Sequence, residues 1–287
     1  MKIIDTLKEE YATISETEQR RLSANQNNTV LELTNIIHSW HKSSAFLKSH
    51  CMNETDLDED YVSAQKQIDL INFEPSDIFA LSLHLSKIAK GSLGHILGLF
   101  FSALITKEYN SKEHNSKEYN LKKENEKDEL NYEKNNQTYV LMMQNYLFGV
   151  NNIGYCNDGA NIHIIGNVGD YLGKKMKSGS ITVEGDARDL VGTYMNNGEI
   201  TITGNTLDET GSFMENGKIY VKGNTQFEVG RGMWNGEIHI DGFAHGEIGP
   251  VSTGGKIYIG KKIINRQIFR MCTAEVYEKQ NGVFERV

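Results

Sequence analysis

Five glycines recur at a constant interval of 19 residues in the second half of the chain: Gly179, Gly198, Gly217, Gly236 and Gly255. Ala160 stands one interval before the first of them, so the repeated region begins there and continues to Lys261. A fixed period of this length indicates stacked copies of one structural unit, each contacting its neighbours, and not a single globular core. The period therefore constrains the fold more than any other feature of the sequence.

Each copy contains the signal of a short, half-buried strand. Isoleucine or valine occupies its third and fifth positions, and a single residue expected to face outward lies between them. The apolar pairs are Ile162/Ile164, Ile181/Val183, Ile200/Ile202, Ile219/Val221, Ile238/Ile240 and Ile257/Ile259. The outward residues are His163, Thr182, Thr201, Tyr220, His239 and Tyr258.

Glycine returns at the seventh and fourteenth positions, where we expect sharp corners that exclude a Cβ atom. These structural glycines are Gly166, Gly173, Gly185, Gly192, Gly204, Gly211, Gly223, Gly230, Gly242 and Gly249. Methionine follows the second glycine by three residues, at Met176, Met195, Met214 and Met233, and its flexible side chain is expected to fill the interior. Two polar ladders are predicted, with amides bonding along the stack: Asn167, Asp186, Asn205 and Asn224 in one corner, and Asn197, Asn216 and Asn235 in another.

These features predict a right-handed parallel β-helix of about six 19-residue coils over residues 138–262. The left-handed hexapeptide helix of acyltransferases is excluded, because its coil consists of three similar sixes. The nine-residue calcium-binding repeat is excluded because its GGxGxD signature is absent. Residues 138–149 are expected to cover the first coil, and residues 263–287 to form a C-terminal cap with a hairpin turn at Asn281–Gly282.

Residues 1–106 are predicted to be a helical domain or arm, so the whole chain belongs to the α+β class. Pro75-Ser76-Asp77 is typical of a helix start, and the apolar residues from Ile78 onward share one helix face. Gly91, Gly94 and Gly98 lie on nearby turns and would permit helices to approach one another closely. The most apolar run, residues 91–106, is shorter than the ~20 residues that a bilayer requires, so no membrane span is expected.

Residues 107–137 are interpreted as a charged, low-complexity linker. Pentads such as Lys107-Glu108-Tyr109-Asn110-Ser111 recur, charges of both signs alternate, and few aliphatic residues are available to bury. Such a segment is expected to be a mobile linker or a solvated helix, and we assign it no chemistry.

The net charge of −8 excludes a basic nucleic-acid footprint. The three cysteines lie far apart and form no CxxC pair, which suits a reducing compartment. The first residues lack the apolar core of a secretory signal, so a cytoplasmic location is expected.

Candidates for chemistry are few. His38 and His41 are three residues apart on an expected helix, with His50 and Cys51 further along, and they are weak metal-ligand candidates because no second fixed pair accompanies them. His245 with Glu247 could form an acid–base pair, although no nucleophile is predictable nearby. The sequence predicts no catalytic residue and no metal site.

The glycine and methionine spacing across GSITVEGDARDLVGTYMNNGEITITGNTLDETGSFMENGKIYVKGN resembles the GXGXG-repeat β-helix. That domain forms the C-terminal part of the glutamate synthase large subunit, and the β-helical subunit of formylmethanofuran dehydrogenase is similar to it. The resemblance covers roughly residues 150–262. It implies a non-catalytic subunit, or a paralogue of one, that packs against the catalytic domains of an oxidoreductase or amidotransferase assembly.

In such an assembly the partners would be other subunits of the oxidoreductase complex. Any FMN, iron–sulfur or molybdenum/tungsten centre would belong to those subunits, because the resemblance implies no cofactor on this chain. A homo-oligomer is a further candidate assembly. The residues that differ between copies in the corners are the candidate partner contacts: Arg188, Asp208, Arg231 and Trp234.

Two other hypotheses stay open at this point. One is a free-standing enzyme whose site lies between the helical region and a face of the β-helix, using His38 and His41 or His245 and Glu247. The other is a homo-oligomeric binding module that grips a polymer with the outward Thr/Tyr/His ladder.

Overall fold

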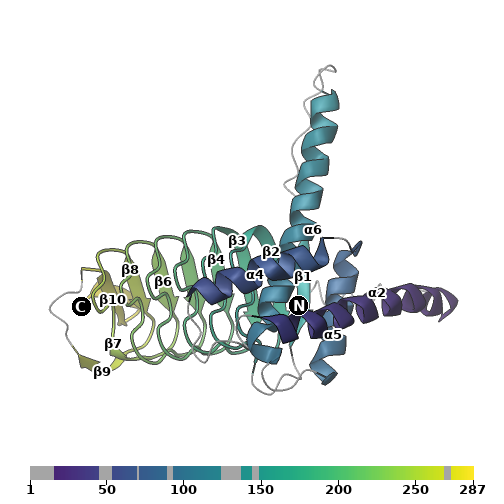
Figure 1. Cartoon of the computed structure of the whole chain (residues 1–287). Helices are drawn as coiled ribbons and strands as arrows, with labels where there is room; N and C mark the ends of the chain where they lie inside the picture. The colour runs from purple at the N-terminus through teal and green to yellow at the C-terminus, as the bar shows by residue number, and fades with distance from the viewer. Residues whose placement is uncertain are drawn as a thin grey trace.

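The computed structural model describes residues 16–44, 54–69, 71–88, 93–123, 137–143, 149–267 and 273–287. Helices gather at one end of the molecule, and the strands stack away from them toward the C-terminal end (Figure 1). The stack is a parallel β-solenoid, as the repeat period predicted.

Seven strands of the main sheet, one from each turn of the solenoid, pair in parallel. They are β1 (Thr138–Met142), β2 (Asp158–Ile165), β3 (Ser178–Glu184), β4 (Glu199–Ile202), β5 (Lys218–Val221), β6 (Glu237–Ile240) and β8 (Lys256–Ile259). The prediction of about six coils was one turn short, because β1 is itself a strand of the sheet and not only a cover over it. Its Tyr139 is in register with Ile162 of β2. The right-handed winding of the coils stays a prediction.

The interior contains the side chains that the repeat predicted. The isoleucine and valine pairs of the strands are buried, and so are the four repeat methionines. Like residues lie in register from coil to coil, as in the pairing of Ile181 with Ile200 and of Ile200 with Ile219. The core is therefore a set of continuous ladders.

The two repeat glycines are required for different reasons. At the fourteenth position, Gly211 has a φ of 74°, and a Cβ there would lie 2.3 Å from Cδ1 of Ile238. At the seventh position, Gly223 has an ordinary φ, but a Cβ would lie 2.5 Å from the carbonyl oxygen of Gly204 in the preceding coil. Gly223 therefore serves the close approach of neighbouring coils, where the sequence predicted a corner.

Non-glycine residues also adopt positive φ values at fixed places in the coil. Leu190 and Glu209 at the twelfth position have φ values of 64° and 57°, and Tyr194 and Phe213 at the sixteenth have 56° and 53°. This conformation costs roughly 1–2 kcal/mol for each L-residue. The turn geometry imposes it, and no glycine pattern in the sequence indicated it.

The last strands close the C-terminal end. A short sheet of β7 (Ala244–Glu247) and β9 (Ile263–Gln267) lies beside the main sheet, while β10 (Glu275–Gln280) pairs in parallel with β8. Strand β11 (Val283–Arg286) returns antiparallel to β10. The predicted hairpin turn is confirmed, and the φ values of 50° and 87° at Asn281 and Gly282 are those of a type I′ turn.

The N-terminal region consists of α2 (Glu16–Ser43), α4 (Glu54–Ile68), α5 (Pro75–Ile88) and α6 (Leu93–Lys123) among the described residues. Helix α5 begins at Pro75, as predicted. These helices share a core that includes Leu33, Trp40 and Phe100. None of the described helices is long and apolar enough to cross a membrane.

Helix α6 caps the first turn of the solenoid. A Cβ on Gly98 would lie 2.0 Å from the carbonyl oxygen of Asn151, so only glycine permits this contact. The carbonyl oxygen of Gly94 accepts the N–H of Asn151 at 3.1 Å, and Ser102 Oγ accepts the N–H of Gly154 at 2.9 Å. At Gly94 and Gly98 the close approach is therefore made by the first coil of the solenoid and not by another helix, while Gly91 lies outside the described residues.

Helix α6 continues without a break past position 106 to Lys123 and projects away from the body (Figure 1), which fits the solvated helix expected as one alternative for this segment. Lys107 Nζ donates to the carbonyl oxygen of Ile71 at 2.9 Å, and the buried Glu108 accepts a hydrogen bond from Tyr139. These tertiary contacts give the first residues of the expected linker a fixed place. Residues 124–136 of that expected linker lie outside the described residues.

Candidate functional site

A groove of about 840 Å³ runs along one corner of the solenoid and crosses five coils. We call it the Asx groove, after the Asn and Asp residues that form one of its walls. It is lined by Gly149, Asn167, Val168, Asp186, Ala187, Arg188, Asn205, Thr206, Leu207, Asn224, Thr225, Gln226, Phe227, Phe243 and His245. Its volume lies within the usual range of ligand-binding sites.

The Asx wall is held rigid by hydrogen bonds between coils. Asn167 Oδ1 accepts the backbone N–H of Asp186 at 2.8 Å, and Asp186 Oδ1 accepts that of Asn205 at 2.7 Å. Asn205 and Asn224 continue the series at 2.9 Å each, the last bond coming from the N–H of Phe243. The side-chain amides of Asn205 and Asn224 also donate to the preceding Oδ1 at 3.1 Å, which confirms the predicted bonding along this ladder.

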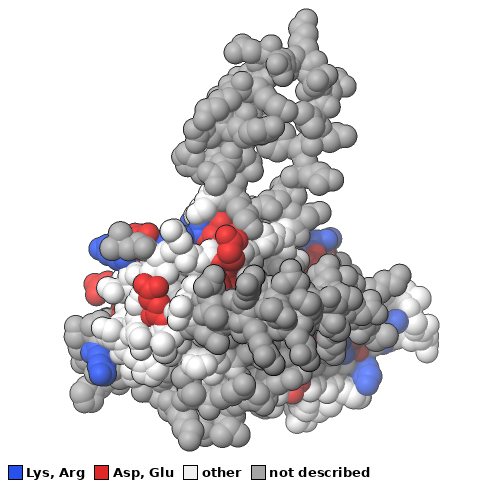
Figure 2. Space-filling view, turned by 90° about the vertical axis from the view of Figure 1, so that its right-hand side faces the viewer, with Lys and Arg blue, Asp and Glu red and all other residues white. Residues whose placement is uncertain are grey.

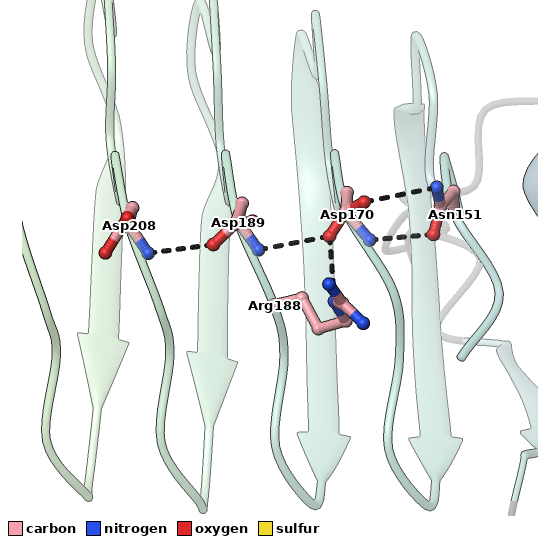
Figure 3. Close-up of polar contacts among 5 residues, drawn as sticks. All are labelled: Asn151, Asp170, Arg188, Asp189 and Asp208. Atoms are coloured by element: carbon pink, nitrogen blue, oxygen red, sulfur yellow. Dashed lines mark hydrogen bonds and ion pairs between the residues drawn. The ribbon is translucent and has the colours of Figure 1, made fainter. Parts of the chain in front are cut away.

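A second ladder of the same kind lies three repeat positions further along the chain (Figure 3). Asn151 Oδ1 accepts the N–H of Asp170 at 2.9 Å, Asp170 Oδ1 accepts that of Asp189 at 3.4 Å, and Asp189 Oδ1 accepts that of Asp208 at 3.0 Å. Arg188 Nε donates to Asp170 Oδ1 at 3.2 Å, so the guanidinium in the groove is already paired. This second ladder was not predicted, although Asp170, Asp189 and Asp208 recur at the 19-residue interval.

Aromatic rings close the C-terminal end of the Asx groove. Phe227 keeps 48% of its surface exposed, and its ring covers Gly246, where a Cβ would lie 2.5 Å from Phe227 Cδ1. His245 meets the Phe227 ring edge-on, with 6.4 Å between ring centroids. Lys261 Nζ lies 4.9 Å from the centroid of the Phe243 ring. The groove therefore has a polar wall and an apolar, aromatic end.

The predicted ladder of Asn197, Asn216 and Asn235 behaves differently. These asparagines lie along a second hollow of about 620 Å³, beside Glu199 and Lys218. Within the described residues, no side-chain hydrogen bond joins the three amides to one another. The expected bonding along this stack is therefore wrong, and the three asparagines are exposed to solvent.

The four predicted partner-contact residues lie in different surroundings. Arg188 is in the Asx groove and Asp208 belongs to the second ladder. Arg231 is paired with Glu228, whose hydrogen bond and negative charge raise the pKa of the guanidinium. Trp234 lies outside both hollows and keeps 62% of its surface exposed.

Further aromatic and apolar residues lie near Trp234 in the repeat. At the sixteenth position, the rings of Tyr194 and Phe213 from neighbouring coils stack with 5.2 Å between centroids. The ring of Phe213 covers Gly232, and Val251 follows at the same position with 46% of its surface exposed. This corner therefore offers exposed apolar surface.

The outward ladder of the main sheet ends in a stack of rings. Tyr220, His239, Tyr258 and Tyr277 stand in adjacent strands, with 4.9, 4.5 and 4.9 Å between successive centroids and interplanar angles of 22° or less. Each inner ring therefore has both faces covered by its neighbours. This arrangement stabilises the sheet but leaves few ring faces for a polymer, which weakens the hypothesis that the ladder grips one.

The candidate metal ligands do not form a site among the residues that the structure describes. His38 Nδ1 lies 2.8 Å from the carbonyl oxygen of Thr34, and burial, followed by the proximity of His38, lowers the pKa of His41. No group of three or more His, Cys, Asp or Glu side chains that could hold a metal ion occurs in the described ranges. His50 and Cys51 lie outside them.

His245 and Glu247 share the outward face of β7, but they engage different neighbours. His245 packs against Phe227, while the negative charge of Glu247 contributes to the raised pKa of Arg231. No hydrogen bond joins His245 to Glu247 in the described part of the chain. The pair is therefore not assembled for general acid–base chemistry.

A polar cluster that the sequence did not reveal joins α4 to the first coils. Asp58 accepts hydrogen bonds from Tyr155 and from Lys175 Nζ, the latter at 2.9 Å. Burial alone would raise the Asp58 pKa, but the two hydrogen bonds and the nearby lysine charges outweigh it and lower the pKa. Burial and the charge of Asp58 raise the pKa of the Cys156 thiol to about 11, so this cysteine is unreactive near neutral pH.

Charges on the helical end are mixed. Where described residues are visible on this face, the Lys and Arg side chains are scattered among Asp and Glu (Figure 2). A scattered arrangement of this kind does not form the basic stripe expected for nucleic-acid binding.

No protein-family model matches this chain, and no curated protein matches it either. The resemblance to the GXGXG-repeat β-helix stays an interpretation of the repeat spacing. Any assignment of function therefore rests on the residues described above.

Proposed function

We propose that this protein is a non-catalytic scaffolding subunit, or a paralogue of one, in a cytoplasmic multi-subunit oxidoreductase. The observation that carries the proposal is the exposure of Trp234, which keeps 62% of its surface accessible on a rigid coil. Other copies place Lys177, Asn196, Glu215 and Thr253 at this position. Tryptophan is enriched among the residues that dominate protein–protein binding energy.

The architecture supports this role. A solenoid of ladders offers long, rigid faces that can contact a partner over several coils. The repeat glycines and methionines have structural duties in the turns and the core, so they are not needed for chemistry. In this proposal the catalytic groups, whether flavin, iron–sulfur or molybdenum/tungsten centres, belong to the partner subunits.

The binding surface in this proposal is the corner that carries Trp234 and Val251, with the paired Arg231 beside it. Its apolar surface suits the centre of an interface, and the Arg231–Glu228 ion pair suits a polar rim. A partner that buries Trp234 would cover the most exposed aromatic side chain of the described residues.

Affinity purification of the tagged full chain from its native cell tests the proposal. The wild-type chain is expected to recover an oxidoreductase subunit with a flavin or metal absorbance, and the Trp234→Ala variant is expected to lose it. Phe284→Ala is the matched control, because Phe284 is also exposed but lies on the terminal hairpin. Recovery of the chain alone or only as a homo-oligomer, or retention of the partner by Trp234→Ala, would contradict the proposal.

A further inference from the structure

We infer that the Asx groove is a binding site for a neutral, linear oligosaccharide, with one sugar ring stacked on Phe227. This inference concerns a corner of the solenoid that the proposed docking surface does not use. It therefore stands whether or not the scaffolding role is correct.

The length of the groove favours a linear ligand. Its Asx wall runs from Asn167 to the position of Phe243 and crosses four coil-to-coil steps. At ~4.8 Å for each step, the wall is about 19 Å long. A compact metabolite would fill only part of such a groove, whereas a chain of several sugar units would contact all of it.

The wall presents fixed hydrogen-bonding groups of both kinds. Oδ1 of Asp186 is occupied by the next coil, while its Oδ2 has no hydrogen-bond partner among the described residues. The amide groups of Asn205 and Asn224 each use one N–H within the ladder and retain a second. A sugar hydroxyl both donates and accepts, so it can bond to this mixture of acceptors and donors.

The ladder also holds these groups in place before any ligand arrives. Each wall side chain is fixed through its Oδ1 by a backbone N–H of the following coil, at 2.7–2.9 Å. Pre-organised side chains lose less conformational entropy on binding.

The charges of the groove favour an uncharged ligand. Asp186 is the acidic residue of its lining, and Arg188 is already paired with Asp170 at 3.2 Å. Arg188 is the lysine or arginine of the described lining, Lys261 lies only at the Phe243 end, and the chain carries a net charge of −8. Polyanions are therefore disfavoured relative to neutral sugars.

Phe227 supplies the apolar contact that sugar rings require. One side of its ring packs on Gly246, and nearly half of its surface is open at the end of the groove. In the outward ladder, by contrast, the Tyr258 ring lies between His239 and Tyr277. The polymer-binding hypothesis drawn from the sequence is thus better placed in the Asx groove than on that ladder.

Titration calorimetry on the full chain tests the inference, with cellohexaose, xylohexaose and chitohexaose as neutral probes. Polygalacturonate and a neutral extended peptide serve as competing ligand classes. At least one neutral hexasaccharide is expected to bind, and Phe227→Ala is expected to weaken this binding about tenfold because the stacking contact is lost. Phe284→Ala is the control, because it removes an exposed aromatic ring of the terminal hairpin, outside the groove.

A second variant separates binding from folding. Asp186→Asn keeps the Oδ1 acceptor for the next coil but replaces the Oδ2 acceptor with a donor, so the ladder is expected to form. It should weaken oligosaccharide binding about two- to tenfold with little change in melting temperature. The inference is overturned if no neutral oligosaccharide binds at millimolar concentration, if Phe227→Ala and Asp186→Asn both bind like the wild type, or if only the peptide or the polyanion binds.

Discussion

Thr210 Oγ1 donates a hydrogen bond to Thr206 Oγ1 at 2.8 Å inside the solenoid. One coil later, Thr225 occupies the position of Thr206, but Val229 replaces Thr210. The Thr225 hydroxyl is buried and has no partner among the described residues. Thr206 and Thr225 thus occupy equivalent positions in neighbouring coils, but the Thr206 hydroxyl accepts a hydrogen bond, whereas the Thr225 hydroxyl has no partner among the described residues.

Thr225→Val is therefore expected to stabilise the protein. The substitution removes an unsatisfied buried hydroxyl and replaces it with a methyl group of similar shape, which should raise the free energy of unfolding by about 1 kcal/mol. Chemical denaturation monitored by circular dichroism measures the change. Thr206→Val is the matched control and should destabilise by about 1 kcal/mol, because it leaves the Thr210 hydroxyl unpaired. Equal effects of the two substitutions would contradict the prediction.

Val251→Asn is expected to raise the melting temperature. Val251 has a φ of 52°, a conformation that is unfavourable for a β-branched residue, and it is exposed enough to lose little by becoming polar. Asparagine tolerates this conformation, so a gain of about 1 kcal/mol is expected. Val283→Asn is the control in thermal melts, because Val283 is also exposed but lies in a regular strand. In that strand, asparagine should leave the melting temperature unchanged or lower it.

Periodic features of the fold could be predicted from the sequence, because each coil repeats the same local requirements. The burial of Met176 and the strand at Ile181–Val183 follow from spacing alone. The seventh turn could also have been found, since Gly154 stands 19 residues before Gly173 and takes the corresponding turn conformation. Its strand concealed it, because Tyr139 pairs with Ile162 at an interval of 23 residues, whereas the later strands are 19 residues apart.

Contacts between distant segments could not be predicted. Asp58 and Lys175 are 117 residues apart in the chain, and no periodic pattern relates them. The Asx groove was foreseen only in part: its wall of Asn205 and Asn224 follows from the repeat, but the ring of Phe227 at its end is a departure from the repeat. Groups that bind a ligand are often such departures, because a ladder of identical residues mainly stabilises the stack.

Gly98→Ala is expected to weaken the attachment of the helices to the solenoid. An alanine Cβ would lie 2.0 Å from the carbonyl oxygen of Asn151, and backbone cannot move aside as a side chain can. The clash should cost about 1–3 kcal/mol and outweigh the gain of roughly 1 kcal/mol in helix propensity.

Gly94→Ala is the matched control on the same helix. Its Cβ would lie 3.3 Å from the carbonyl oxygen of Gly149, which a small adjustment can relieve. Hydrogen exchange of α6 and of residues 150–157 should therefore increase in Gly98→Ala and stay close to wild type in Gly94→Ala. Unchanged exchange in Gly98→Ala would show that α6 does not depend on this contact.

The Asp58 contact with Tyr155 and Lys175 should make the stability depend on pH. The folded pKa of Asp58 lies below its ordinary value of 3.8, so the unfolded chain binds the proton more readily. The stabilising contribution is therefore complete above about pH 5 and is lost as the pH falls through the folded pKa. Melting temperatures of the wild type and of Asp58→Asn, measured between about pH 2.5 and 7, should differ by a constant amount at the upper end and converge as the pH falls through the folded pKa. When both proteins also carry Lys175→Met, the difference in melting temperature at the upper end should be smaller, because Lys175 Nζ donates to Asp58 Oδ2 at 2.9 Å. A difference that persists unchanged at the lowest pH would mean that the ionised carboxylate does not stabilise the junction.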